Sequence, residues 1–131
     1  MKTYLAIFKP LEGGGYFVRF PDVEGVLTEG HSLEHAFEMA TDALALILAD
    51  YEKLPKPSQA EDLEPKLAPG ERLVPVPVDP KLVFHYQPKQ RVNVSLPTPI
   101  LQAIDVARAK TGQDRSEFLA EGAKILLEQG A

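Results

Sequence analysis

The last 43 residues of the chain constrain its fold most, because they contain more apolar surface than so few elements can bury. Residues 91–96 (RVNVSL) alternate strictly between polar and apolar side chains, which predicts a strand with Val92, Val94 and Leu96 on one face. A single strand leaves its hydrogen-bonding edge open, and one strand with two short helices is too small for a core. Two copies solve both problems, since their strands pair antiparallel and their helices interlock. We therefore predict an obligate homodimer built on a ribbon-helix-helix module.

The two helices of this module have recognisable ends. Thr98 is suited to cap the first helix, with Pro99 at its first position and Gly112 just beyond its end. Asp114 and Glu117 have the spacing of a capping box for the second helix. The apolar positions of the two helices are Ile100, Leu101, Ile104, Ala107, Phe118, Leu119, Ile125 and Leu126.

The polar face of the paired strands predicts a DNA contact. It presents Arg91, Asn93 and Ser95 from both chains. A two-stranded ribbon fits the major groove, where arginine bonds guanine and asparagine bonds adenine in bidentate fashion. The alternative is that these three residues are only the solvated face of an edge strand. The order of strand, proline-started helix, glycine stop and capped helix favours contacts to operator bases.

Phosphate contacts are expected from Lys89 and from the start of the second helix, at Arg115 and Ser116. Backbone amides at a helix N-terminus attract a phosphate. Asp114 works against this, because its carboxylate can occupy the same amides and repel the anion.

The first 80 residues predict a small antiparallel sheet with a packed helix, which is an α+β arrangement. Segments 2–9 and 16–20 are apolar and flank a glycine triplet, as in a hairpin, and 26–28 is a short third strand. Ser32 is a natural cap for a helix whose apolar residues recur every three to four positions. Those residues are Leu33, Ala36, Phe37, Ala40, Leu44, Ile47, Leu48 and Tyr51.

Two connectors complete this part of the chain. Residues 52–71 are rich in proline and charge, and Ser58 with Glu61 has capping-box spacing for a short helical turn. Residues 73–78 are β-prone but contain two prolines, so they fit only a sheet edge. Residues 79–88 are read as a second connector that could hold a short strand at 82–86. The predicted domains are thus 1–80 and 89–131, with a linker at 81–88.

Charge divides the chain in the same way. Residues 1–88 hold 8 Lys and Arg against 14 Asp and Glu, a net charge of −6, whereas residues 89–131 hold 6 against 5, a net charge of +1. An acidic body repels nucleic acid and attracts basic partners. The sequence shows no signal peptide, no apolar run near the roughly 18 residues of a membrane span and no cysteine, which together fit a cytoplasmic protein.

These features together resemble the HicB family of antitoxins with a ribbon-helix-helix C-terminus. The N-terminal resemblance lies in residues 15–25 (GYFVRFPDVEG), in Thr28-Glu29-Gly30 and in the amphipathic helix that follows. The C-terminal resemblance lies in residues 91–97 and 115–118 (RSEF). Val26 stands where this family often has a cysteine, an exchange between two small apolar side chains.

The resemblance implies a partly degenerate RNase H-like N-terminal domain that binds and occludes HicA, a small basic toxin that cleaves RNA. It also implies that the C-terminal module represses the promoter of its own operon. An acidic domain suits a basic partner, because complementary charge selects partners and speeds association. Asp22, Glu24 and Glu29, in loops around the third strand, are the candidate toxin contacts.

We predict no catalytic site, metal site or cofactor. Two-metal hydrolysis needs several converging carboxylates, and the first strand contains none. His31 and His35 are four apart, but His31 precedes the helix cap and no third ligand is near in the sequence.

Two other functions stay open at this point. One is a stand-alone DNA-binding regulator whose N-terminal domain senses a ligand or oligomerises. The other is a catalytic N-terminal domain that is targeted by the C-terminal module. Whether the N-terminal domains join dimers into tetramers is also left open.

Overall fold

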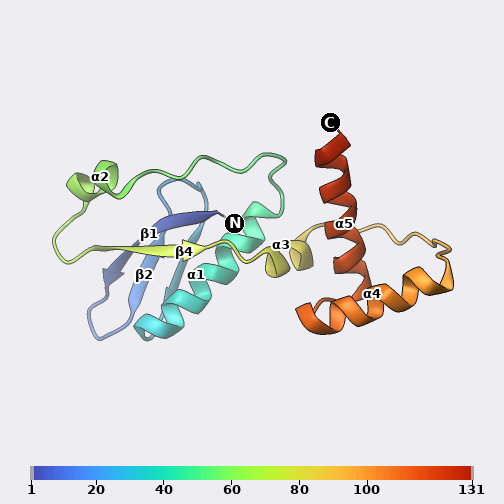
Figure 1. Cartoon of the computed structure of the whole chain (residues 1–131). Helices are drawn as coiled ribbons and strands as arrows, with labels where there is room; N and C mark the ends of the chain where they lie inside the picture. The colour runs from blue at the N-terminus through green and yellow to red at the C-terminus, as the bar shows by residue number, and fades with distance from the viewer. Residues whose placement is uncertain (1, 131) are drawn as a thin grey trace. The chain divides into compact units, whose positions relative to one another are not determined.

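The computed structural model describes residues 2–130 and divides into two compact units, Met1–Pro88 and Lys89–Ala131 (Figure 1). Unit 1 contains a four-stranded sheet with short helices around it, and unit 2 contains two helices. No helix in residues 2–130 has the length and apolar character needed to cross a membrane.

The sheet of unit 1 is antiparallel throughout, with the strand order β3-β2-β1-β4. Its strands are β1 (Thr3–Pro10), β2 (Tyr16–Arg19), β3 (Leu27–Gly30) and β4 (Arg72–Pro77). The predicted hairpin is confirmed: Gly13, Gly14 and Gly15 turn the chain between β1 and β2 with φ of 87°, 105° and 89°. The third strand is also present, one residue later than predicted.

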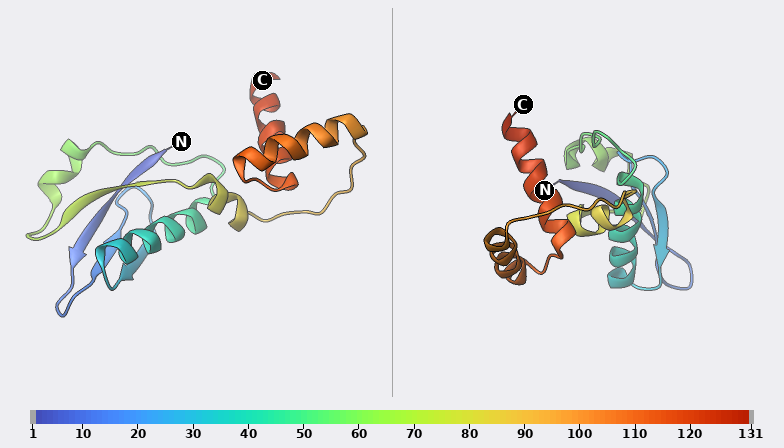
Figure 2. Two further views of the ribbon diagram at one scale, coloured as in Figure 1. Left: turned by 60° about the horizontal axis from the view of Figure 1, so that its bottom comes forward. Right: turned by 90° about the vertical axis from the view of Figure 1, so that its right-hand side faces the viewer.

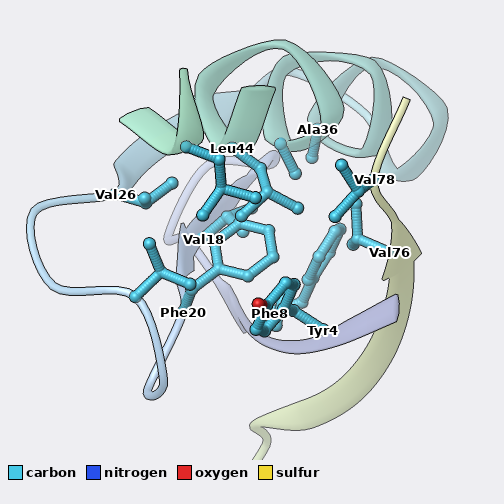
Figure 3. Packing of buried hydrophobic residues seen from close by; sticks show 13 residues of the cluster. Tyr4, Phe8, Val18, Phe20, Val26, Ala36, Leu44, Val76 and Val78 are labelled. Atoms are coloured by element: carbon cyan, nitrogen blue, oxygen red, sulfur yellow. The ribbon is translucent and has the colours of Figure 1, made fainter. Parts of the chain in front are cut away.

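Helix α1 (Leu33–Leu48) covers one face of the sheet and completes the core (Figures 2 and 3). Ser32 caps it as predicted, because its hydroxyl accepts the His35 N–H at 3.1 Å. The helix ends three residues before Tyr51, which is exposed instead of continuing the apolar face. The sheet and α1 together bury Tyr4, Ala6, Phe8, Val18, Ala36, Ala40, Leu44, Leu48 and Val76.

Gly30 lets β3 pass closely beneath the first turns of α1. A Cβ atom at this position would lie 2.3 Å from the backbone nitrogen of Ala36 and 2.5 Å from its Cα. Backbone atoms cannot move aside as a flexible side chain can. The close packing of β3 on α1 therefore requires glycine here.

The connector between α1 and β4 is a packed part of unit 1. It contains α2 (Ala60–Leu63) and a 3-10 turn (Glu64–Lys66), and Leu63 is buried. The capping box predicted at Ser58 is wrong. Both the backbone N–H and the hydroxyl of Ser58 donate to the Asp22 carboxylate, 36 positions away, at 2.7 and 2.6 Å. The helical turn itself is present but begins one residue later, with Gln59 at the cap position and no side-chain cap bond.

An ion pair fastens the other end of this connector to the sheet. Arg19 of β2 donates to Glu71 at 2.7 and 3.3 Å, and the Ala68 N–H donates to the same carboxylate. The Glu71 side chain is only 5% exposed. The bonds from Arg19 and Ala68 lower the pKa of Glu71 from 4.5 to about 2.

Replacing Glu71 with glutamine tests this ion pair through the pH dependence of unfolding. A carboxyl whose pKa is lowered by folding stabilises the folded state above its unfolded pKa, and that stability is lost as pH falls toward the folded pKa. We expect Glu71→Gln to lower the urea midpoint at pH 6, and the gap from wild type to shrink between pH 4.5 and pH 2. A gap that stays constant over this range would show that Glu71 does not contribute through its charge.

Strand β4 lies at the sheet edge, which confirms the prediction made from its two prolines. The segment after it differs from the prediction, because 82–86 is part of a helix, α3 (Pro80–Tyr86), and not a strand. Asp79 caps α3 by accepting the backbone N–H groups of Lys81 and Leu82, and Pro80 occupies its first turn. The Tyr86 hydroxyl donates to Asp42 of α1. Residues 81–88, predicted as a linker, thus lie within unit 1.

Candidate functional site

Residues 88–97 contain neither helix nor strand in the single chain, so the strand predicted at 91–96 is not formed (Figure 2). A β-ladder needs a neighbour that supplies hydrogen-bonding groups, and within residues 2–130 no strand is paired with this segment. Val92 and Val94 are 71% and 65% exposed. Two of the three apolar side chains of the predicted strand are thus largely exposed, whereas Leu96 is half-buried.

The predicted DNA-contacting residues of this segment are all accessible. Arg91, Asn93 and Ser95 are exposed, as is Lys89 just before them. They lie at alternate positions, so pairing with a second strand would put the first three on one face.

Two helices follow, α4 (Thr98–Thr111) and α5 (Arg115–Gly130). The start of α4 is shifted from the prediction by one residue, since Pro97 takes the cap position and Thr98 is already helical. Gly112 ends α4 in the left-handed conformation, with φ of 74°. The capping box of α5 is confirmed, because Asp114 accepts the Glu117 N–H at 2.8 Å and Glu117 accepts the Asp114 N–H at 3.2 Å.

Asp105 connects the two helices of unit 2. It accepts two hydrogen bonds from Arg115, at 2.9 and 2.8 Å, and one from Arg108 at 2.8 Å. These guanidinium groups hold the pKa of the Asp105 carboxyl well below its usual range. Arg115, predicted as a phosphate contact, therefore holds the turn between α4 and α5 in the single chain, whereas Ser116 is exposed.

Asp105 is not among the residues predicted from the sequence. Its spacing of three from Arg108 could have indicated the first ion pair. The bidentate pair with Arg115 depends on how the turn directs α5 back toward α4. The spacing of residues in the sequence does not determine that direction.

Unit 2 leaves most of its apolar side chains uncovered. In residues 89–130 only Ile104 is buried, whereas unit 1 buries seventeen hydrophobic residues in its described part. A folded domain of this size normally covers such side chains in a core of its own. The exposed large ones are Val92, Val94, Ile100, Val106, Leu119, Ile125, Leu126 and Leu127.

Gly122, in the middle of α5, distinguishes a lone unit 2 from a paired one. In the single chain a Cβ atom here meets nothing within 4 Å. If unit 2 works alone, Gly122→Ala should stabilise α5 by up to about 1 kcal/mol. The homodimer predicted from the sequence would pack a partner helix closely on this glycine, so we expect the reverse, a lower melting temperature and weaker self-association. Thermal melting and sedimentation at several concentrations measure both effects.

The three acidic residues predicted to contact the toxin differ in their exposure and in their bonding. Asp22 is partly buried and holds Ser58 of the connector. Glu24, in the turn before β3, and Glu29, in β3, are both exposed. Asp22 is thus occupied structurally, and the other two are free to face solvent.

The two histidines predicted not to bind a metal lie stacked, with ring centroids 4.0 Å apart. The His31 backbone N–H donates to Nδ1 of His35 at 3.1 Å, so this pair shapes the start of α1. Within residues 2–130, no group of three His, Cys, Asp or Glu side chains is arranged to hold a metal ion.

Comparison with known proteins places these features in one family. The sequence model of a family described as "HicB_like antitoxin of bacterial toxin-antitoxin system" matches residues 4–123. Antitoxin HicB 1 of Photorhabdus laumondii is 47% identical over a 58-residue alignment that covers 41% of this chain and 37% of that protein. An uncharacterised 14.9 kDa protein of Haemophilus phage HP1 is 30% identical over 113 residues, with 82% of this chain and 84% of that protein covered.

Solved structures show the same arrangement of elements. The antitoxin HicB of Burkholderia pseudomallei has a TM-score of 0.55 and 28% identity, with 94% of this chain and 96% of that chain covered. Antitoxin HicB3 has a TM-score of 0.52 and 26% identity over 93% and 95% of the two chains. A chain of a toxin–antitoxin complex from Streptococcus pneumoniae has the same fold, with a TM-score of 0.55, 24% identity and coverage of 94% and 97%. The chain therefore belongs to the HicB-like family of antitoxins of bacterial toxin–antitoxin systems.

Proposed function

We propose that this antitoxin neutralises a HicA-like toxin through unit 1 and represses its own operon through a homodimer of unit 2. The observation that carries the proposal is the apolar surface of unit 2. In residues 89–130, eight large hydrophobic side chains are exposed and one residue is buried, so a second copy is needed to cover them.

In the proposed dimer, segments 91–96 of two copies pair as an antiparallel ribbon above the four helices. The valines then pack on the helices, and Arg91, Asn93 and Ser95 face the bases of the operator. Lys89 and Ser116 contact phosphates, which fixes the position of the ribbon in the groove. The Arg115 guanidinium already donates to Asp105, so it would have to be shared between this carboxylate and a phosphate. We therefore expect Arg115 to contribute least to DNA affinity among the phosphate contacts.

Unit 1 supplies the toxin-binding part of the proposal. It carries a net charge of −6, and a small basic toxin would be attracted to it. Glu24 and Glu29 are exposed and available to such a partner, whereas Asp22 would have to release Ser58. In this proposal unit 1 is a non-catalytic domain of RNase H-like type, whose first strand contributes no carboxylate.

Co-expression with the product of the neighbouring reading frame tests the toxin part. We expect a small basic protein to co-purify with this chain and to stop cleaving RNA when bound. A second assay measures binding of the purified antitoxin to DNA from its own promoter in a gel shift. A neighbour with no affinity for this chain, together with a normal gel shift, would replace the proposal with a stand-alone DNA-binding regulator.

A further inference from the structure

Unit 1 has an open groove between the N-terminal half of α1 and the edge strand β4. Leu33 and Phe37 line it from the helix, and Leu73 and Val74 line it from the strand. The groove has a volume of about 590 Å³, within the range of sites that bind ligands. Leu33 is 46% exposed, so an apolar side chain of unit 1 faces solvent at this place.

The groove is open because α3 covers only one half of the α1 face that carries Glu38 and Asp42. Glu38 and Asp42 are four residues apart and therefore lie on the same face of the helix. Asp42 is bonded to Tyr86 of α3, and Val83 of α3 packs against the core. No corresponding helix lies over the half that contains Glu38, as far as residues 2–130 show.

The edge of β4 keeps its hydrogen-bonding capacity at the groove. Pro75 has no N–H and pairs with Leu5, so by the alternation of an antiparallel ladder its backbone faces away from β1. Leu73, two residues earlier, then also directs its N–H and carbonyl to the free side of the sheet. Pro77 lacks a backbone N–H as well, so the two prolines discourage another strand from pairing at their end of β4. At the other end, the backbone N–H of Leu73 is a hydrogen-bond donor beside the groove.

The rim of the groove carries charge suited to a basic partner. Glu34 and Glu38 contribute two exposed carboxylates from α1. Arg72, on the strand side, is directed to Tyr16, since it donates to the Tyr16 hydroxyl at 3.2 Å and lies 5.9 Å from the centre of its ring. The helix side is thus acidic around an apolar floor.

We propose that this groove is the docking site for the toxin, which inserts an apolar side chain beside Leu33 and Phe37 and places lysine or arginine against Glu34 and Glu38. The inference rests on the proposed function, because the toxin is the occupant. It moves the main toxin contact from Glu24 and Glu29 to the groove where α1 meets β4. A few side chains that are buried in pockets near the centre of an interface usually contribute most of the binding energy.

The test measures binding of the full-length antitoxin variants to the small basic protein from the neighbouring reading frame, by calorimetry. We expect Leu33→Lys, and separately Glu34→Lys with Glu38→Lys, to weaken binding by at least about 30-fold. Leu46→Lys is the matched control, because Leu46 is 50% exposed on α1 and does not line the groove. It should change the dissociation constant less than about threefold. The variant with Glu34→Lys and Glu38→Lys changes only exposed side chains, so we expect it to fold. It therefore tests the groove even if Leu33→Lys does not fold.

A photo-crosslinking residue at position 33 identifies the occupant, with position 46 as the control. A crosslink from position 33 to the toxin supports the inference. A crosslink to a second copy of this chain, or none at all, overturns it, as does weaker binding of Glu24→Lys with Glu29→Lys while the groove variants bind normally. If even the wild-type chain fails to bind the neighbouring protein, the proposed function fails and this inference fails with it, whereas normal binding by the groove variants overturns the inference alone.

Discussion

Replacing Val92 and Val94 with aspartate is expected to leave the protein monomeric and unable to bind its operator. Burying a valine side chain contributes about 1.5–3 kcal/mol, and the proposed dimer buries four of these side chains. The variant removes this contribution and would also bury four unpaired carboxylates. Sedimentation equilibrium at micromolar concentration measures the loss of the dimer, and a gel shift with promoter DNA measures the loss of binding.

The matched control is the neighbouring pair on the other face of the same segment. Asn93→Asp with Ser95→Asp introduces the same number of charges where the proposed dimer has solvent or DNA. We expect this variant to remain dimeric and to lose DNA binding through repulsion of the phosphates. Unit 1 keeps its own core in both variants, so its near-ultraviolet circular dichroism should not change. A Val92/Val94 variant that stays dimeric would show that segment 91–96 does not form the interface.

The elements predicted best from sequence are those determined by neighbouring residues. The hairpin at Gly13–Gly15, the Ser32 cap and the Asp114–Glu117 capping box all form as expected. In each case the residues that determine the structure lie within about four positions of one another, so local backbone chemistry is sufficient.

The errors have a different cause. In one case a group distant in the sequence binds the residue that was expected to cap a helix, and in another two local patterns predict different elements for the same segment. Ser58 has the spacing of a helix cap, but Asp22 takes both of its donors. The run at 82–86 is too short for its periodicity to distinguish strand from helix, and the start signal at Asp79 and Pro80 determines the outcome. The groove at Leu33 could not be predicted either. It forms only because β4, which pairs with β1, lies next to the start of α1, and these segments are about 40 residues apart in the sequence.

The candidate DNA site could be predicted as a set of residues but not as a surface. The alternation at 91–96 groups Arg91, Asn93 and Ser95, and all three are exposed. A strand, however, is a property of two segments, so the single chain leaves this one without regular structure. In the proposed function, a second copy of the chain would complete the surface that reads DNA.

Arg91→Ala is expected to abolish specific operator binding while leaving the dimer intact. A bidentate contact between arginine and guanine contributes about 1–3 kcal/mol of discrimination, and a symmetric dimer makes it twice. Loss of both contacts weakens specific binding by about 30-fold or more, whereas weak binding to unrelated DNA changes little because Lys89 and the helix termini still face the phosphates. Competitive gel shifts with promoter and scrambled DNA measure both affinities, and sedimentation checks the dimer. Lys110→Ala is the control, since it also removes one positive charge, from the last turn of α4, and Lys110 is not among the proposed DNA contacts. Equal loss of affinity for both DNAs would assign Arg91 to a phosphate contact, and unchanged specific affinity would remove it from the site.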